Sequence, residues 1–441
     1  MFKTISNIFR IPDLKKKILF TLLILVLYRL GSFIPIPGVD TTQLKDFFAR
    51  QTGSLFDLLN LFVGGNFERA SVFALGIMPY ITASIVIQLL GSIVPYFEKL
   101  RKEGAEGQKK LNQITRYGTV LLAAFNAITI TVGLVNMQGG TGPVVPYPNF
   151  LFHFTGMVTL ITGTMIVMWL GEQITEHGIG NGISLIIFAG IIARYPEGFV
   201  NMFTTRFTSL RGVIVSLAAI VIMVLVTAAI IFVTEAIRKI PVQYAKRIVG
   251  RRVYGGQSTY IPLRVNTAGV IPIIFAQSIL MFPATIITLF QGGNAEPGTF
   301  LSTLRLWFSP GQFVYTVIYV GLIIFFAYFY TAIVLNPTEM AENMVKYGGH
   351  VPGKKPGKKT AEYINSVLTR ITLPGAVFFA FVALLPELMT HFFNLPFYFG
   401  GTGLIIVVGV ALDTLRQIES HLVMRHYDGF MKKGKLRGRS G

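Results

Sequence analysis

Ten long apolar runs account for much of this chain of 441 residues. A helix needs roughly 20 mostly apolar residues to cross a bilayer, so these runs predict a polytopic, all-α integral membrane protein. The fifth run is short, and its length alone would also fit a re-entrant segment. The runs cover residues 18–36, 72–94, 117–137, 151–171, 179–193, 212–234, 266–290, 313–335, 371–391 and 400–417.

The composition supports the same class and excludes several kinds of site. Charged residues make up 13% of the chain, whereas a soluble domain has about 25%. The absence of cysteine excludes disulfides, thiolate metal sites and a cysteine nucleophile. The six histidines form no H-E-x-x-H zinc motif. We therefore expect no metal and no cofactor.

The distribution of basic residues predicts the topology. If the N-terminus is cytoplasmic, 31 of the 39 Lys and Arg residues fall in cytoplasmic segments, which is the positive-inside pattern. The alternative, in which the fifth run does not cross, would place the later basic loops outside. The charges therefore favour ten crossings with both termini in the cytoplasm, and most of the net charge of +19 follows from topology.

Three segments between the runs are unusual. Two cytoplasmic loops, about 235–265 and 336–370, are longer than simple connections, and such loops are usually functional or disordered. On the outer side, residues 54–65 have apolar residues at helical spacing but are too short to cross. This stretch, which ends at Gly64 and Gly65, could lie on the membrane or fold into a cavity.

Glycine-rich and charged positions suggest no catalytic chemistry. Residues 353–360 resemble a P-loop, but they have three residues between the glycines where the motif needs four. Residues 178–184 fit a close-packing turn better than a dinucleotide site. Arg29 is the one charge near the middle of a span, and its purpose is not evident from the sequence. The lack of buried carboxylates disfavours a proton-coupled carrier, and no Ser–His or paired-Asp arrangement suggests an intramembrane hydrolase.

Eight motifs lie along essentially the whole chain: Gly76–Ile81, Trp169–Glu176, Gly178–Ser184, Tyr244–Arg247, Gly250–Tyr254, Gln257–Thr259, Phe282–Thr285 and Phe397–Thr402. Together they resemble the bacterial SecY family, the channel subunits of the Sec protein translocase. The resemblance implies ten helices in two pseudo-symmetric inverted halves, 1–193 and 194–441, around a central hourglass pore. Such inverted repeats are common among transport proteins.

The resemblance also assigns site residues. It implies a pore ring of Ile77, Ile81, Ile183, Ile187, Ile274 and Ile406. A lateral gate into lipid would include Thr82, Asn181 and Phe282, although ordinary interhelical hydrogen bonds would explain Thr82 and Asn181 equally well. A plug over about 55–69 would include Leu55, Phe56, Leu59, Phe62, Gly64, Gly65 and Arg69.

Partners follow from the same family. The long loops would dock the motor ATPase SecA or the ribosome, whose RNA phosphates suit arginine, through Lys246, Arg247, Arg251, Arg252, Lys354 and Lys355. SecE and SecG would be companion subunits, and signal sequences, nascent or presecretory polypeptides and membrane lipids would be bound in transit. Lys355 stands where the family usually has arginine and Tyr260 where histidine is common; lysine keeps the charge but lacks the planar fork of arginine.

The expected function is passive. The chain would move unfolded secretory polypeptides across the bacterial plasma (inner) membrane and release apolar segments sideways into it. SecA, the ribosome or the proton-motive force would supply the energy. The main alternative is a secondary transporter of a small solute.

Overall fold

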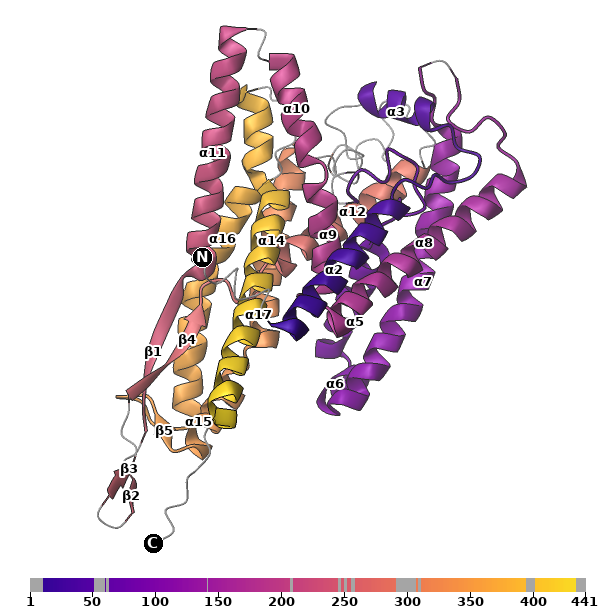
Figure 1. The fold of residues 1–441 in the computed structure, drawn as a ribbon. Coiled ribbons are helices and arrows are strands. Elements are labelled where there is room, and N and C mark those ends of the chain that lie inside the picture. Colours follow the sequence, from indigo (N-terminus) through magenta and orange to yellow (C-terminus); the bar gives the residue numbers. More distant parts are fainter. Residues whose placement is uncertain are drawn as a thin grey trace. The chain divides into compact units, whose positions relative to one another are not determined.

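The computed structural model places the chain in two compact units (Figure 1). The first unit comprises Met1–Phe199, Ala284–Arg305 and Val410–Gly441, and the second comprises Val200–Pro283 and Leu306–Gly409. The predicted boundary between inverted halves at 193–194 stays a prediction. Within these units the structure describes residues 11–50, 60, 63–140, 142–206, 209–244, 247–249, 252–254, 258–290, 307, 311–393 and 401–433.

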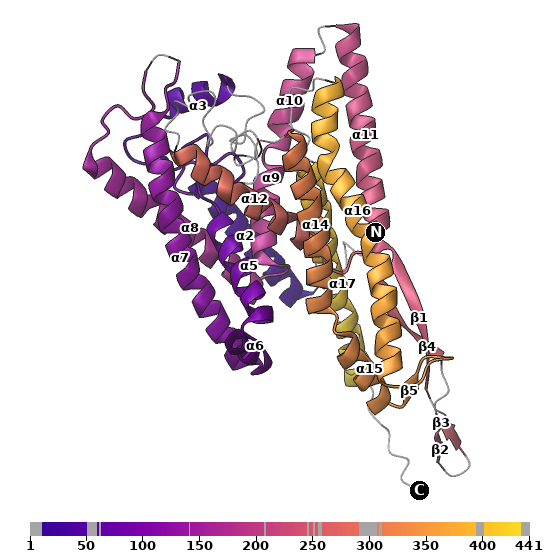
Figure 2. The same cartoon turned by 180° about the vertical axis from the view of Figure 1, so that it is seen from behind.

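Helices and the turns between them make up the described part of the first unit. α7 packs against both α5 and α8, and α2 packs against α8 and α9 (Figure 2). A bidentate ion pair joins α7 to α8, where Arg116 donates to the Glu172 carboxylate at 2.9 and 2.7 Å. The helices are α2 (Pro12–Gly31), α3 (Thr41–Arg50), α5 (Met78–Ile93), α6 (Pro95–Lys102), α7 (Ala105–Asn136), α8 (Phe150–His177) and α9 (Gly182–Ile192).

The second unit combines long helices with a sheet. α14 lies along α16, which also contacts α11 and α15. α10 passes from the first unit into the second. α12 belongs to the second unit up to Pro283 and to the first from Ala284, and α17 belongs to the second unit up to Gly409 and to the first from Val410. The helices are α10 (Tyr195–Arg206), α11 (Leu210–Glu235), α12 (Ile271–Phe290), α14 (Phe313–Val334), α15 (Pro337–Lys346), α16 (Lys358–Phe393) and α17 (Gly401–Lys433).

Each of the ten predicted spans has a helix in the structure. Seven helices among the described residues are long and apolar enough to cross a membrane, or eight if α5 and α6 form one span bent by 97° at Pro95. The other two predicted spans are α2, which carries Lys15–Lys17 and Arg29, and α12, whose apolar part Ile271–Met281 is short. The fifth predicted span, α9, runs on toward α10 as an apolar stretch over Gly182–Thr204.

Several helices extend well beyond the apolar runs. α7 begins at Ala105 and α16 at Lys358, each about a dozen residues before the predicted span. Charged residues such as Lys and Glu are good helix formers, and pairs such as Glu106 with Lys110 at 3.5 Å support the added turns. Apolar length therefore predicts the membrane crossing but not the ends of the helix.

A small sheet adds to the predicted all-α fold where the sequence indicated only a loop. β1 (Ile237–Tyr244) pairs antiparallel with β4 (Ser258–Arg264), and β5 (Gly349–His350) pairs with the other edge of β1. β2 (Arg247–Val249) and β3 (Arg252–Tyr254) form a separate antiparallel pair. The alternating residues Ile240 and Val242 are buried in one core with residues of α15 and α16, as period-two burial predicts.

Candidate functional site

The pore positions expected in the first unit lie at the start of α5, where Ile77 is the N-cap residue, and on α9. The N–H of Ile81 donates to the carbonyl of Ile77 at 3.1 Å, so these residues are one helical turn apart on one face. Both side chains are 5% exposed. On α9, Ile187 is buried and Ile183 half-buried. Each helix therefore presents a pair of branched apolar side chains inside the unit.

The remaining pore positions, Ile274 on α12 and Ile406 on α17, are also buried. Val270, one turn before Ile274, lies directly against Gly409, one turn after Ile406. α12 and the first turns of α17 therefore pack closely within the second unit. The six residues thus occupy apolar, largely buried positions on four helices, and their convergence into a single ring stays a prediction.

Two of the three predicted lateral-gate residues bond within their own elements. The Thr82 hydroxyl donates to the carbonyl of Met78 at 3.1 Å. Asn181 caps α9 by accepting from the N–H of Ser184 at 3.2 Å, and its side chain is exposed. Among the described residues, no interhelical hydrogen bond of either side chain is seen. Phe282 belongs to α12, but its side chain lies outside the described residues.

The predicted plug is described only at its C-terminal end, since Leu55, Phe56, Leu59 and Phe62 lie outside the described residues. Gly64 and Gly65 have φ of +72° and +81°, the left-handed region that favours glycine. Gly64 lies against the backbone of α9, where a Cβ added to Gly64 would come 2.5 Å from the Cα of Gly190. This turn therefore contacts α9 backbone to backbone.

Arg29, whose purpose the sequence left open, binds this turn. Its Nη1 donates to the carbonyl of Gly64 at 3.2 Å. Its guanidinium also lies 5.7 Å from the ring centre of Phe33, and that of Arg69 lies 4.7 Å from the same ring. Carbonyl oxygens and ring faces both stabilise a cation. The carbonyl partner is 35 residues away in the chain, so no local pattern could have revealed it.

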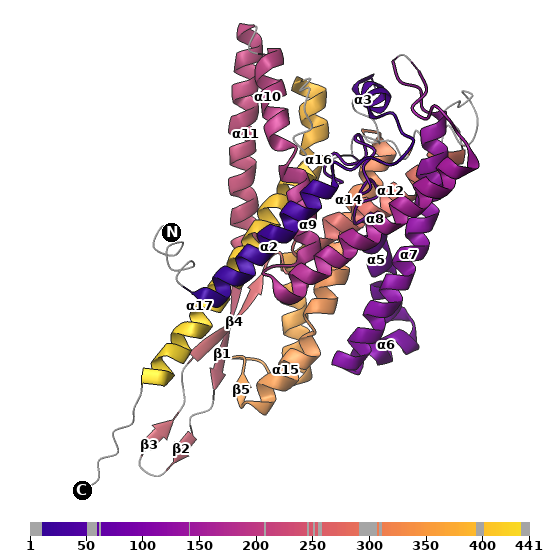
Figure 3. The same cartoon turned by 45° about the vertical axis from the view of Figure 1, so that its right-hand side comes forward.

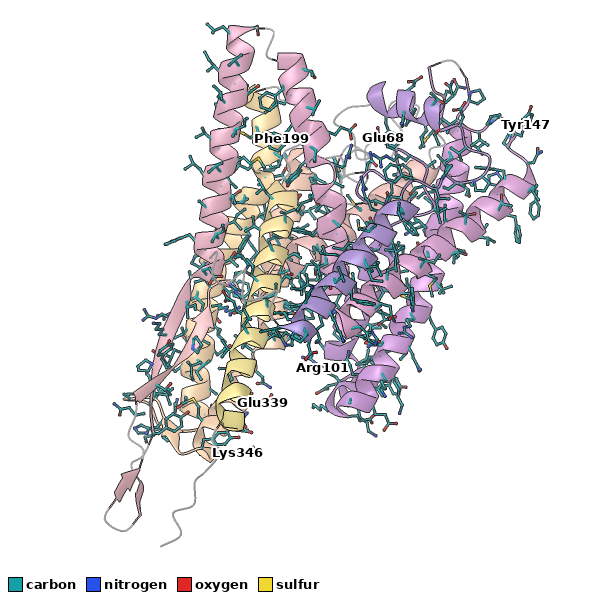
Figure 4. All side chains as sticks on the ribbon, viewed as in Figure 1. Glu68, Arg101, Tyr147, Phe199, Glu339 and Lys346 are labelled. Atoms are coloured by element: carbon teal, nitrogen blue, oxygen red, sulfur yellow. The ribbon has the colours of Figure 1, made fainter. Side chains whose placement is uncertain are left out.

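An acidic residue in the same region holds a second arginine. Glu68 Oε2 accepts from Arg194 Nη2 at 3.4 Å and from Asn60 Nδ2 at 2.9 Å. Glu68 is labelled in Figure 4, and Arg194 follows the end of α9. Arg194 and Glu68 are 126 positions apart, so the sequence gives no signal that they pair.

The glycine-rich segment 178–184 is a packing turn, which the sequence favoured in preference to a dinucleotide site. Three of its N–H groups donate to side chains from three helices: Ile179 to Thr21 at 3.0 Å, Gly180 to Gln417 at 2.9 Å and Gly182 to Thr175 at 3.0 Å. A Cβ on Gly182 would collide with the carbonyl of Gly171. The turn therefore ties α2, α8 and α17 to the start of α9.

The basic positions of the two long loops are exposed where they are described. Lys354 lies 5.2 Å from the ring centre of Tyr363, and Lys355 is exposed. In the first loop, Lys239 of β1 lies 4.6 Å from the ring centre of Tyr260 on β4. Lys239 is a basic residue outside the motifs that carry the resemblance. Lys246 and Arg251, and the side chains of Arg247 and Arg252, lie outside the described residues.

The titratable side chains suggest no metal centre. Among the described residues, no group of three or more His, Asp or Glu side chains is placed to hold a metal ion. The site is therefore described by its apolar helix positions, the glycine turns beside them and the basic loops.

Comparisons with known proteins place the chain in one family. The profile of the SecY family matches residues 71–415. The protein translocase subunit SecY of Escherichia coli (strain K12) is 49% identical over 427 residues, covering 97% of this chain and 96% of that protein.

Two solved structures share the fold at low identity, and each comparison covers 93% of both chains. The structure of a protein conducting channel has a TM-score of 0.67 at 19% identity. Sec61 in the canine ribosome–channel complex from the endoplasmic reticulum has a TM-score of 0.64 at 18% identity. The predicted fold class is thereby confirmed.

Proposed function

This chain belongs to the SecY family, and from that premise we propose that it forms the protein-conducting channel of a bacterial Sec translocase. It passes unfolded secretory polypeptides across the plasma membrane and releases apolar segments into lipid. The observation that carries the proposal is the 49% identity to a translocase subunit over nearly the full length of both chains.

The chemistry of the pore positions suits a conduit that must reject ions. Six isoleucines supply branched apolar side chains, and a hydrophobic constriction excludes ions by dewetting. Apolar side chains also form no sequence-specific hydrogen bonds, so they can yield to polypeptides of any sequence. The ring, the lateral gate at Thr82, Asn181 and Phe282, and the plug over about 55–69 are parts of this proposal.

The orientation and partners belong to the proposal as well. The positive-inside pattern supports a cytoplasmic location for both termini and for the basic loops. SecA or a ribosome docks on these loops and, with the proton-motive force, supplies the energy, while SecE and SecG accompany the channel. The exposed Arg238, Lys239 and Arg264 of the β1–β4 pair add basic groups to that surface. The ribosome in the solved Sec61 complex supports ribosome docking.

A cross-linking experiment tests the channel directly. The chain has no cysteine, so single cysteines at Ile81 and at Ile274 give a clean background. A stalled presecretory chain is expected to cross-link at both positions, and not at Leu22 or Phe232, which are 54% and 78% exposed. Labelling confined to the two control positions would contradict the pore assignment.

Proteoliposomes separate this function from the secondary transporter. Reconstituted with SecE, and supplied with SecA and ATP, the protein is expected to import a presecretory protein. Uptake of a small solute without any protein import would favour the transporter.

A further inference from the structure

The described end of the plug closes on itself through three hydrogen bonds. The N–H of Gly65 donates to the carbonyl of Asn60 at 2.8 Å, and the N–H of Glu68 donates to Asn60 Oδ1 at 3.1 Å. Asn60 Nδ2 returns a bond to the Glu68 carboxylate at 2.9 Å. Residues 60 and 63–71, which we call the plug anchor, are therefore a preformed unit that can be held or released as a whole.

Helix α2 holds the plug anchor on one side through consecutive residues. Arg29 donates to the carbonyl of Gly64. The hydroxyl of Tyr28 donates to the carbonyl of Val63 at 3.5 Å and accepts from Asn66 Nδ2 at 3.2 Å. Tyr28 is only 2% exposed. A buried polar contact of this kind is stabilising only while its partners stay in place, because an unpaired buried group is costly.

Helix α9 meets the other side of the anchor. Its Gly190 lies against Gly64, and Arg194 just beyond it pairs with Glu68 at 3.4 Å. α2 and α9 pack on each other (Figure 3), so the anchor sits against two helices that are themselves in contact. Val63 also lies beside Gly76, since a Cβ added to Gly76 would come 3.1 Å from the Val63 side chain. Gly76 directly precedes the pore position Ile77.

The backbone of the anchor is strained at one point. Ala70 has φ of +46° and is the one non-glycine residue with positive φ among the described residues. Its carbonyl accepts from the N–H of Ile36 at 2.7 Å. Strained residues persist only where surrounding contacts hold them. The anchor therefore depends on its external contacts to keep this conformation.

We propose that Arg29 is a positioning residue for the plug: by holding the carbonyl of Gly64 it keeps the plug anchor on α2 and α9, and so keeps the resting channel sealed. The inference rests on the proposed channel function. Arg29 acts through the anchor and touches no transported polypeptide. A cation at membrane depth is costly without partners, and when the anchor leaves, Arg29 loses one of them, which favours the sealed state.

The test compares three variants with the wild-type protein in proteoliposomes that contain SecE and SecG. Arg29→Met removes the donor at similar length, Arg29→Lys keeps one charged donor, and Leu30→Met changes a neighbouring side chain that is 61% exposed. The resting leak is the influx of iodide, read by a trapped halide-sensitive dye without substrate or ATP. Import of a presecretory protein with SecA and ATP, and the melting temperature in detergent, are measured in parallel.

Arg29→Met is expected to raise the resting leak about tenfold, which corresponds to ~1.4 kcal/mol of lost closed-state preference, while it still imports protein. Arg29→Lys should recover most of the seal, and Leu30→Met should match the wild type. An Arg29→Met channel that imports protein and seals as well as the wild type would overturn the inference, whether or not its melting temperature falls. An equal leak from Leu30→Met would overturn it too.

Two further results keep the proposal open to refutation. If Arg29→Met does not fold, Tyr28→Phe removes only the hydroxyl that bonds Val63 and Asn66. It is expected to raise the leak about threefold, ~0.6 kcal/mol, and an unchanged leak would overturn the inference. Wild-type protein that seals but imports nothing would overturn the proposed function, and the inference with it.

Discussion

Two glycine turns at opposite ends of α9 are held in different ways. Before α9, the turn at 178–182 is fastened by neutral acceptors, Thr21, Thr175 and Gln417, on three helices. Toward its other end, the turn at 63–66 is held by Arg29, Tyr28 and a single Gly190 contact. The first suits a permanent joint between helices. The second can part as one unit, because its bonds run to one short loop.

The largest effect is expected from closing the space between Gly64 and Gly190. Gly64→Ala places a Cβ 2.5 Å from the Cα of Gly190 and in a left-handed conformation, which together cost about 2–5 kcal/mol. We expect a strong resting leak in the proteoliposome assay and a lower melting temperature.

Gly65→Ala is the matched control. It shares the left-handed conformation, but its added Cβ would have no neighbour nearer than 3.8 Å, so it should cost only about 1–2 kcal/mol. If both variants leaked equally, the contact with Gly190 would have no special role in holding the plug anchor.

Smaller losses should follow at the turn before α9, and they should affect stability without opening the channel. Gln417→Leu or Thr21→Val removes the acceptor of a backbone N–H, which costs about 1–3 kcal/mol where the N–H is buried. The melting temperature should fall while the iodide leak stays at the wild-type level. Thr159→Val is the control, because its hydroxyl bonds only within α8, to Thr155. A leak from Gln417→Leu would remove the distinction between the two turns.

The smallest effect is expected for the ion pair of the plug anchor. Glu68→Gln keeps an acceptor for Asn60 but removes the charge facing Arg194, and a partly exposed pair contributes about 0.2–1 kcal/mol. Salt screens such pairs, and the screening becomes stronger between about 0.1 and 1 M salt. The wild-type leak should therefore rise slightly over this range. The leak of Glu68→Gln should stay constant over the same range. If the leak of Glu68→Gln rose with salt as much as the wild-type leak does, the ion pair would not help to hold the anchor.

The sequence predicted the parts of the fold that depend on local pattern. Each of the ten apolar runs contains a helix. Ile77 and Ile81, which the resemblance assigns to the pore ring, are buried, and their role stays a prediction. The glycine turn at 178–184 was predicted as a packing turn because it lacks the strand of a nucleotide site. In each case the signal lies within one continuous stretch.

The contacts that hold the plug anchor could not be predicted, because their partners are distant in sequence. Arg29 and Gly64 are 35 residues apart, and Arg194 and Glu68 are 126 apart. The sheet was missed for a different reason. Ile240 and Val242 do alternate with exposed residues, but the run is short and basic, and its basic residues were interpreted as a sign of topology.

The sheet gives the second unit a mechanical property. β1 and β4 share one core with the first turns of α16, and α16 has 36 residues, about 54 Å at 1.5 Å per residue. The strand pair and the first turns of α16 are therefore expected to move together, up to Pro374, which removes a hydrogen bond from the helix interior. Under the proposed topology, a force applied to the strand pair would reach the turns of α16 before Pro374 without any chemical signal passing between them.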